Sequence, residues 1–131
     1  MNIDYQWRGE LTDAEIVALT RSHGGIAEAG WWTRIRPHSL GWVTARVTDA
    51  TLIGFVNVAW DGSDHAFLLD PKVRPDHHHR GIGTELVRQA AAAAEAAGCT
   101  WLHVDFESRL RPFYFDACGF RPTDAGLIAL N

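Results

Sequence analysis

The chain has 131 residues, of which 47% are hydrophobic, and a formal net charge of −4. We expect one domain over residues 1–131, and the lack of a basic excess argues against a nucleic-acid-binding protein. The two cysteines, Cys99 and Cys118, have neither a metal-site spacing nor the number of a disulfide scaffold, which favours a reduced, cytoplasmic location. No apolar run approaches the roughly 18 residues of a membrane-spanning helix, so we expect no membrane partner.

The sequence alternates between strand-like and helix-like segments. Alternating runs rich in β-branched and aromatic residues predict strands, and apolar residues at helical spacing predict helices. In chain order we expect a strand at residues 3–9, helices at 11–25 and 28–39, a hairpin at 41–62, a strand at 64–73, a helix at 82–97, a strand at 100–106, a short helix at 111–120 and a strand at 126–130. Strands with interspersed helices indicate an α/β fold with a mixed sheet.

Several boundaries carry specific signals. Thr12 is predicted to cap the first helix, and Glu15 completes a capping box. The second helix is expected to end before Pro37, because the residue that precedes a proline disfavours helical geometry. Residues 49–51 supply the hairpin turn, and Pro71 predicts a bulge or a break in pairing because it has no N–H to donate.

The most informative stretch is VRPDHHHRGIGTEL, residues 73–86, which joins a predicted strand to a predicted helix. A helix start offers unpaired N–H donors and a positive dipole end, and glycines such as Gly81 and Gly83 let an anion approach the backbone. The stretch therefore predicts a phosphate site. It matches neither common phosphate loop, because the P-loop needs Lys and Ser/Thr after its last glycine and the dinucleotide motif needs a third glycine.

This stretch resembles the acyl-coenzyme-A loop of the GNAT acetyltransferase superfamily, in which a Val-x-Pro strand end precedes a basic, glycine-rich turn and a helix. The corresponding positions here are Val73, Pro75, Gly81, Gly83 and Leu86. The segment FYFDACGF, residues 113–120, is similar to the family's Phe-Tyr-x-x-x-Gly-Phe motif, and the order of elements agrees along essentially the whole chain.

The resemblance implies the fold of that family, a mixed, mostly antiparallel sheet of six to seven strands flanked by about four helices, with a V-shaped split between the fourth and fifth strands. It also implies acetyl-CoA as the cosubstrate and no metal. Backbone groups near the end of the fourth strand would pair with the pantetheine arm, and the glycine turn would hold the diphosphate. The expected coenzyme-binding residues are Lys72, Val73, His78, His79, Arg80, Gly81, Ile82, Gly83 and Thr84.

The resemblance further implies direct transfer of an acetyl group to a primary amine of a small molecule or a peptide. Tyr114 matches the tyrosine that protonates the leaving thiolate in the family, and a phenol stays protonated at neutral pH. A base must deprotonate the amine. Asp70, at the end of its strand, is the preferred candidate, and Asp64, His65 and His103 are alternatives.

Two positions depart from the family pattern. His78 stands where Arg or Gln is usual, and Glu107 stands where an Asn often contacts the pantetheine arm, so that role is not transferred to Glu107. A neutral imidazole donates one N–H to a phosphate but lacks the charge of a guanidinium. The histidine triplet is also open to metal binding, although adjacent side chains rarely converge on one ion without other ligands.

An acyl-coenzyme-A sensor without turnover is the alternative function. Tyr114 argues against a sensor, whereas the changes at His78 and Glu107 leave it open. Because dimers are the commonest soluble oligomers, a homodimer is the expected assembly if this chain associates with itself.

The sequence gives the weakest indication of which molecule accepts the acetyl group. Trp31, Trp32 and Trp60 are candidates for an aromatic wall around it, and Asp61 and Asp64 for attracting a cation. Core packing for the tryptophans and plain solvation for the carboxylates explain these residues equally well.

Overall fold

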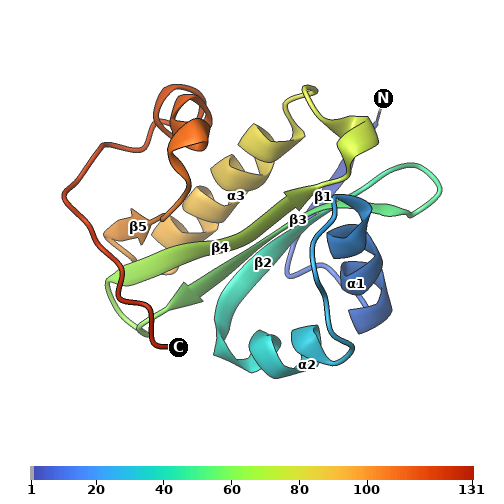
Figure 1. Ribbon diagram of the computed structural model, residues 1–131, viewed down its shortest axis with the longest axis horizontal. Coiled ribbons are helices and arrows are strands. Elements are labelled where there is room, and N and C mark those ends of the chain that lie inside the picture. The colour runs from blue at the N-terminus through green and yellow to red at the C-terminus, as the bar shows by residue number, and fades with distance from the viewer. Residues whose placement is uncertain (1) are drawn as a thin grey trace.

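The computed structural model describes residues 2–131 and contains a five-stranded sheet in the order β1-β2-β3-β4-β5 (Figure 1). The strands are β1 (Asp4–Trp7), β2 (Ser39–Arg46), β3 (Leu52–Trp60), β4 (His65–Val73) and β5 (Trp101–His103). Neighbouring strands are antiparallel from β1 to β4, and β5 runs parallel to β4. The prediction of a mixed, mostly antiparallel sheet is confirmed.

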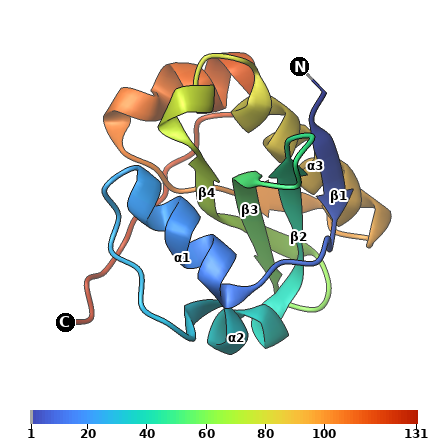
Figure 2. The same cartoon turned by 90° about the vertical axis from the view of Figure 1, so that its right-hand side faces the viewer.

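Helices cover both faces of the sheet. The helices α1 (Asp13–Ser22) and α2 (Trp31–Ile35) lie on one face, and α3 (Ile82–Ala96) lies on the other, as Figures 1 and 2 show together. A short π-helix (Pro112–Ala117) follows β5 and lies beside α3. Within residues 2–131, no helix is both long and apolar enough to cross a lipid bilayer.

The predicted capping box and hairpin turn are confirmed, whereas the helix expected at 28–39 is limited to α2 and a 3-10 turn at Arg36–His38 that includes Pro37. Thr12 Oγ1 accepts a hydrogen bond from the Glu15 N–H at 3.1 Å, and Glu15 Oε1 accepts one from the Thr12 N–H at 2.9 Å, which completes the capping box. The Arg46 guanidinium of β2 hydrogen-bonds the Glu15 carboxylate and lowers the pKa of that group, which ties α1 to the sheet. In the hairpin turn, Asp49 Oδ1 accepts the N–H of Thr51 at 3.0 Å.

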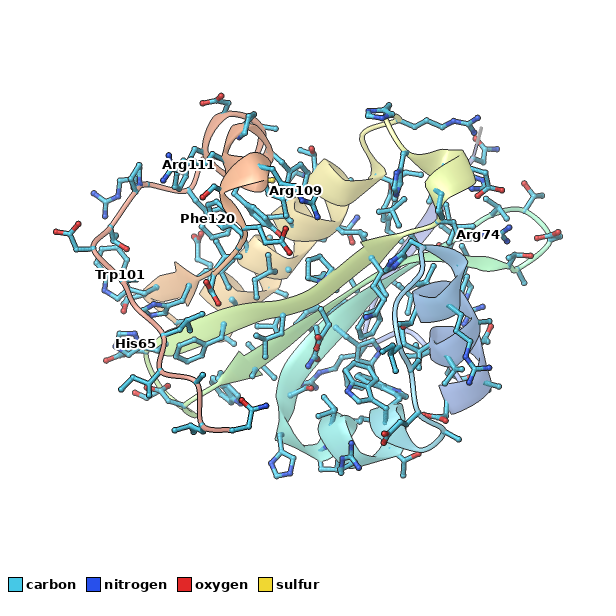
Figure 3. All side chains as sticks on the ribbon, viewed as in Figure 1. His65, Arg74, Trp101, Arg109, Arg111 and Phe120 are labelled. Atoms are coloured by element: carbon cyan, nitrogen blue, oxygen red, sulfur yellow. The ribbon has the colours of Figure 1, made fainter. Side chains whose placement is uncertain are left out.

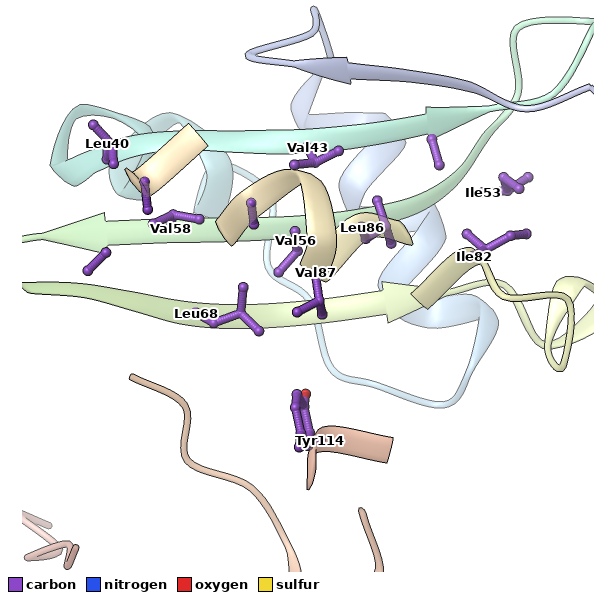
Figure 4. Close-up of a cluster of buried hydrophobic side chains, with 14 residues drawn as sticks. Leu40, Val43, Ile53, Val56, Val58, Leu68, Ile82, Leu86, Val87 and Tyr114 are labelled. Carbon is purple, nitrogen blue, oxygen red and sulfur yellow. The ribbon is translucent and has the colours of Figure 1, made fainter. Parts of the chain in front are cut away.

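The sheet separates two apolar clusters. On the α3 side, Val56 and Leu68 of the sheet pack with Leu86 of the helix (Figure 4). On the α1–α2 side, the ring of Trp32 meets that of Phe55 edge-on, with centroids 5.3 Å apart. The central strands β2 and β3 are therefore buried on both faces, which explains their nearly continuous apolar runs.

The bulge that Pro71 predicted lies in β4. Two steps along β3, from Phe55 to Asn57, face three steps along β4, from Lys72 to Leu69. One extra residue on one strand is the defining feature of a β-bulge, and it turns the end of β4 away from the regular ladder.

The C-terminal part of the prediction was wrong in two places. Residues 126–130 do not form a strand, so the described chain has five strands instead of six or seven. The strand expected at 100–106 is limited to Trp101–His103. A strand needs a neighbour with which to pair, and the three residues of β5 present a short ladder. The apolar run at 126–130 is exposed along its length, because it finds no surface to pack against.

Candidate active site

The turn before α3 leaves the start of that helix open. Gly81 has φ +77°, a left-handed conformation that glycine adopts without strain, and no atom lies within 4 Å of the place a Cβ would take. Within residues 2–131, no side chain caps α3. The N–H groups of its first turn, at Ile82, Gly83 and Thr84, therefore remain available to an anion.

Gly83 has a second role that the sequence did not reveal. A Cβ at this position would lie 3.2 and 3.3 Å from two atoms of the Phe113 ring. The missing side chain lets the π-helix pack directly on the first turn of α3. Gly83 thus links the predicted phosphate site to the helix that carries Tyr114.

The histidines of the turn do not converge. His78 Nε2 lies 2.8 Å from the carbonyl oxygen of Val73, and His77 Nδ1 lies 3.0 Å from Asp76 Oδ1. His79 has φ +63° and is exposed. In the described part of the chain, no three potential metal ligands form a cluster. The His78 side chain therefore connects the turn to the end of β4, and Arg80 faces elsewhere, lining a recess with Tyr5 and Ile82.

The β4 bulge brings two opposite charges to the face covered by α1 and α2. Asp70 has φ +56°, and desolvation by the surrounding protein raises the pKa of its carboxyl, an effect that Lys72 partly offsets. Burial lowers the pKa of Lys72, and the Asp70 carboxylate opposes that shift. The Lys72 ammonium lies over the ring of Trp31, 5.4 Å from its centroid. The two groups thus lie near one another at the bulge, with Lys72 half-buried and Asp70 still exposed to solvent.

The outer edge of β4 is paired over only part of its length. Its pairing with β5 joins His65 to Trp101 and Phe67 to His103, and ends there. No strand of residues 2–131 pairs with this edge at positions 68–73. Figure 1 shows β4 continuing well past β5 toward the turn that precedes α3. His78 occupies the Val73 carbonyl and Pro71 has no N–H, but no strand takes up the other outward backbone groups that lead from the sheet to the open helix start.

Tyr114 lies deep beside this edge. It is 3% exposed, and its ring stacks on Phe106 with centroids 4.5 Å apart. Figure 4 shows the side chain extending from the π-helix toward Leu68 of β4 and Val87 of α3. No residue between 2 and 131 forms a hydrogen bond with its hydroxyl. Burial raises the pKa of the Tyr114 phenol, so it stays protonated well above neutral pH and is suited to act as an acid.

The other candidate bases lie at the far end of β4. His65 Nδ1 and His103 Nε2 are 2.8 Å apart, so these two imidazoles pair with each other. The backbone carbonyl of Asp64 accepts the N–H of Trp101 at 3.1 Å. The Glu107 carboxylate pairs with Arg109 at 2.9 Å on the surface. Among the proposed bases, only Asp70 therefore lies at the bulge.

The matched family model decides the family. The model described as "Acetyltransferase (GNAT) family" matches residues 6–120, which include both the glycine turn and the π-helix. The chain belongs to the GNAT acetyltransferase family.

Known relatives agree with this assignment. A mycothiol acetyltransferase of Nocardia farcinica is 40% identical over 102 residues, 74% of this chain, and the chain spans about one third (33%) of that relative's length. A GNAT family acetyltransferase of Streptococcus pneumoniae superposes with a TM-score of 0.83 at 20% sequence identity. The superposition covers 99% of the present chain and 98% of the Streptococcus chain. The structure of AAC(6')-Iy with a coenzyme A bisubstrate analogue superposes with a TM-score of 0.78 at 18% sequence identity. The superposition covers 100% of the present chain and 99% of the AAC(6')-Iy chain.

Sequence reasoning missed two contacts at the site that join residues of different elements. The contact of Lys72 with Trp31 joins β4 to α2, and the contact of Gly83 with Phe113 joins α3 to the π-helix. Each pair is separated by about 30 residues or more along the chain, and neither has a spacing rule that would pair them. An aromatic wall was proposed for the tryptophans; of these, Trp31 faces Lys72, whereas Trp32 is a core residue at 3% exposed.

Proposed function

We propose that this GNAT protein is an N-acetyltransferase, a single domain over residues 1–131, that moves an acetyl group from acetyl-CoA to a primary amine. The observation that carries the proposal is the uncapped start of α3 adjoining the unpaired edge of β4, with the free hydroxyl of Tyr114 beside it. The three features supply a diphosphate site, a backbone edge for an extended ligand and an acid.

The coenzyme would lie along this path. The first-turn N–H groups of α3 and the positive end of its dipole would hold the diphosphate. The edge at 68–73, which includes Lys72 and Val73 and is not paired with β5, would pair with the pantetheine amides, and the ligand would occupy a V-shaped split between the two strands. A backbone N–H of this edge would also polarise the thioester carbonyl and stabilise the developing oxyanion.

Two side chains would manage the protons. The amine nitrogen attacks the carbonyl carbon of the thioester, forming the C–N bond, and the C–S bond breaks. Asp70 accepts the proton lost from the nitrogen, directly or through one water, and its raised pKa makes it a better base than an ordinary carboxylate. The Tyr114 hydroxyl donates a proton to the leaving thiolate and is reprotonated from solvent.

Calorimetry with acetyl-CoA, followed by a thiol-release assay over a panel of amines, tests the proposal. We expect saturable binding of acetyl-CoA and release of free coenzyme A that depends on an amine. An absence of binding would refute the function. Tight binding without turnover of any amine or peptide would instead support the sensor.

A further inference from the structure

We propose that the acceptor is a small monoamine with a flat aromatic body, bound on the exposed face of β4 and β5. The inference rests on the proposed acetyltransferase function and specifies its acceptor class. The residues of this surface, here called the aromatic face, are Phe67, Leu69, His65, Trp101 and His103.

The direction of approach follows from burial along β4. Ala66 and Leu68 point toward α3 and are 0% and 2% exposed, and Tyr114 fills the same side. Phe67 and Leu69 alternate onto the opposite face and are 40% and 43% exposed. An acceptor therefore reaches the free β4 edge from the side of the aromatic face, since core side chains fill the other side.

The aromatic face is ordered by its own contacts. The rings of Phe67 and His103 stack with centroids 4.7 Å apart and planes 16° from parallel, and His103 is bonded in turn to His65. Trp101 is 51% exposed, with the Arg121 guanidinium on its ring at 5.4 Å. Figure 3 places His65 and Trp101 together at this end of the sheet. Such a surface binds a planar apolar group by stacking and by removing it from water.

The charges beside the aromatic face favour a single cation. Asp70 follows Leu69 directly on β4, and its carboxylate is available to an ammonium group. Asp61, which was a candidate for attracting a cation, is committed to its own turn, where Oδ1 accepts the N–H groups of Ser63 at 2.7 Å and His65 at 3.2 Å. Lys72 adds a positive charge near Asp70 that would repel a polycation. Arg121, over the ring of Trp101, is a second cation at this surface. Two positive charges around the aromatic face therefore disfavour a ligand that carries several positive charges of its own.

The spacing along β4 fits this kind of ligand. A strand rises about 3.3 Å per residue, so Phe67 and Asp70 are separated by roughly 10 Å. A ring over Phe67 and His103 would then place an amine, carried on a chain of two or three carbons, between the aromatic face and Asp70. That position adjoins the free edge where the thioester is proposed to lie.

Thiol release with 2-phenylethylamine, n-butylamine, spermidine and a glycyl peptide tests the acceptor class. We expect kcat/KM for 2-phenylethylamine to exceed that of each other amine by about tenfold or more, as one apolar contact can provide. Phe67→Ala should lower kcat/KM for 2-phenylethylamine about tenfold more than that for n-butylamine, which removes the preference. Phe67→Tyr should restore the preference, and Ile26→Ala, at a 96% exposed position outside the aromatic face, should leave it intact.

The possible failures can be told apart. A preference for spermidine or the peptide, or an equal loss with all amines in Phe67→Ala, would overturn the acceptor class and leave the acetyltransferase function standing. Binding of acetyl-CoA without turnover of 2-phenylethylamine would overturn it too. A dimer that Phe67→Ala dissociates without changing turnover would show that a second copy covers the aromatic face. If wild-type protein does not bind acetyl-CoA, the proposed function itself fails, and the inference with it.

Discussion

The imidazole of His78 donates a hydrogen bond from Nε2 to the backbone carbonyl of Val73, at 2.8 Å. The direction of this bond is determined by its partner, because a carbonyl oxygen only accepts. The contact joins the glycine turn to the last residue of β4, the two backbone segments proposed to hold the coenzyme. A histidine at this position therefore braces the turn, which is a different task from that of the Arg or Gln usual in the family.

His78→Ala should weaken acetyl-CoA binding because it frees the turn from β4. Loss of one hydrogen bond of about 1 kcal/mol corresponds to a roughly fivefold higher Kd, measurable by calorimetry. His77→Ala is the matched control, since the neighbouring imidazole bonds Asp76 and does not reach β4. Equal effects of the two substitutions would contradict the bracing role.

Tyr114→Phe should lower kcat by about a hundredfold, the typical contribution of a general acid, without changing the Kd for acetyl-CoA. The melting temperature should hardly change, because the lost hydroxyl has no hydrogen-bond partner within residues 2–131. The chain has two tyrosines, and Tyr5→Phe, on β1, provides the control. Unchanged single-turnover rates in Tyr114→Phe would rule out the acid role.

Asp70→Asn should exchange activity for stability. Desolvation raises the pKa of Asp70, so the folded state holds this proton more tightly than the unfolded chain does. Stability is therefore lost as the pH rises from the ordinary carboxyl pKa through the raised one, and the loss persists at neutral pH. The substitution should raise the melting temperature at pH 7, with no gain at about pH 3, where the carboxyl is protonated in both states.

The same variant should lose most of its turnover and the acidic limb of its pH–rate profile, because that limb reports ionisation of the base. Asn also tolerates the positive φ of this position. Asp49→Asn is a control that should lower the melting temperature at pH 7 instead of raising it, since hydrogen bonds from Thr51 lower the pKa of Asp49 and favour its ionised form in the folded state. A profile in Asp70→Asn that keeps its acidic limb would assign the base elsewhere.

Gly81→Ala should both destabilise the protein and weaken coenzyme binding. Its φ of +77° costs an L-residue about 1–2 kcal/mol, and relief of that strain would disturb the donors at the start of α3. Gly98 has φ +98° and lies just after the C-terminal end of α3, away from the proposed diphosphate site. Gly98→Ala should therefore lower the melting temperature to a similar extent and leave the Kd for acetyl-CoA unchanged. Parallel losses of affinity would show that the effect is one of stability alone.

Much of the site was predictable because its signals are local. The capping box at Thr12, the bulge at Pro71 and the open turn at Gly81 each depend on residues a few positions apart. The missing strand at 126–130 was not predictable in this way. Its apolar composition satisfies the local preference for a strand, but pairing depends on what β5 offers, which is a short edge of three residues.

The sequence by itself determined the family, most of the elements and the glycine turn before α3, since backbone conformation at glycines, prolines and helix caps is decided by near neighbours. Only the tertiary structure showed that His78 reaches Val73, that Phe113 needs the space at Gly83, and that Asp70 and Lys72 lie near one another at the bulge. These contacts join side chains from different elements. Their distances and their desolvation exist only after the sheet and helices have packed.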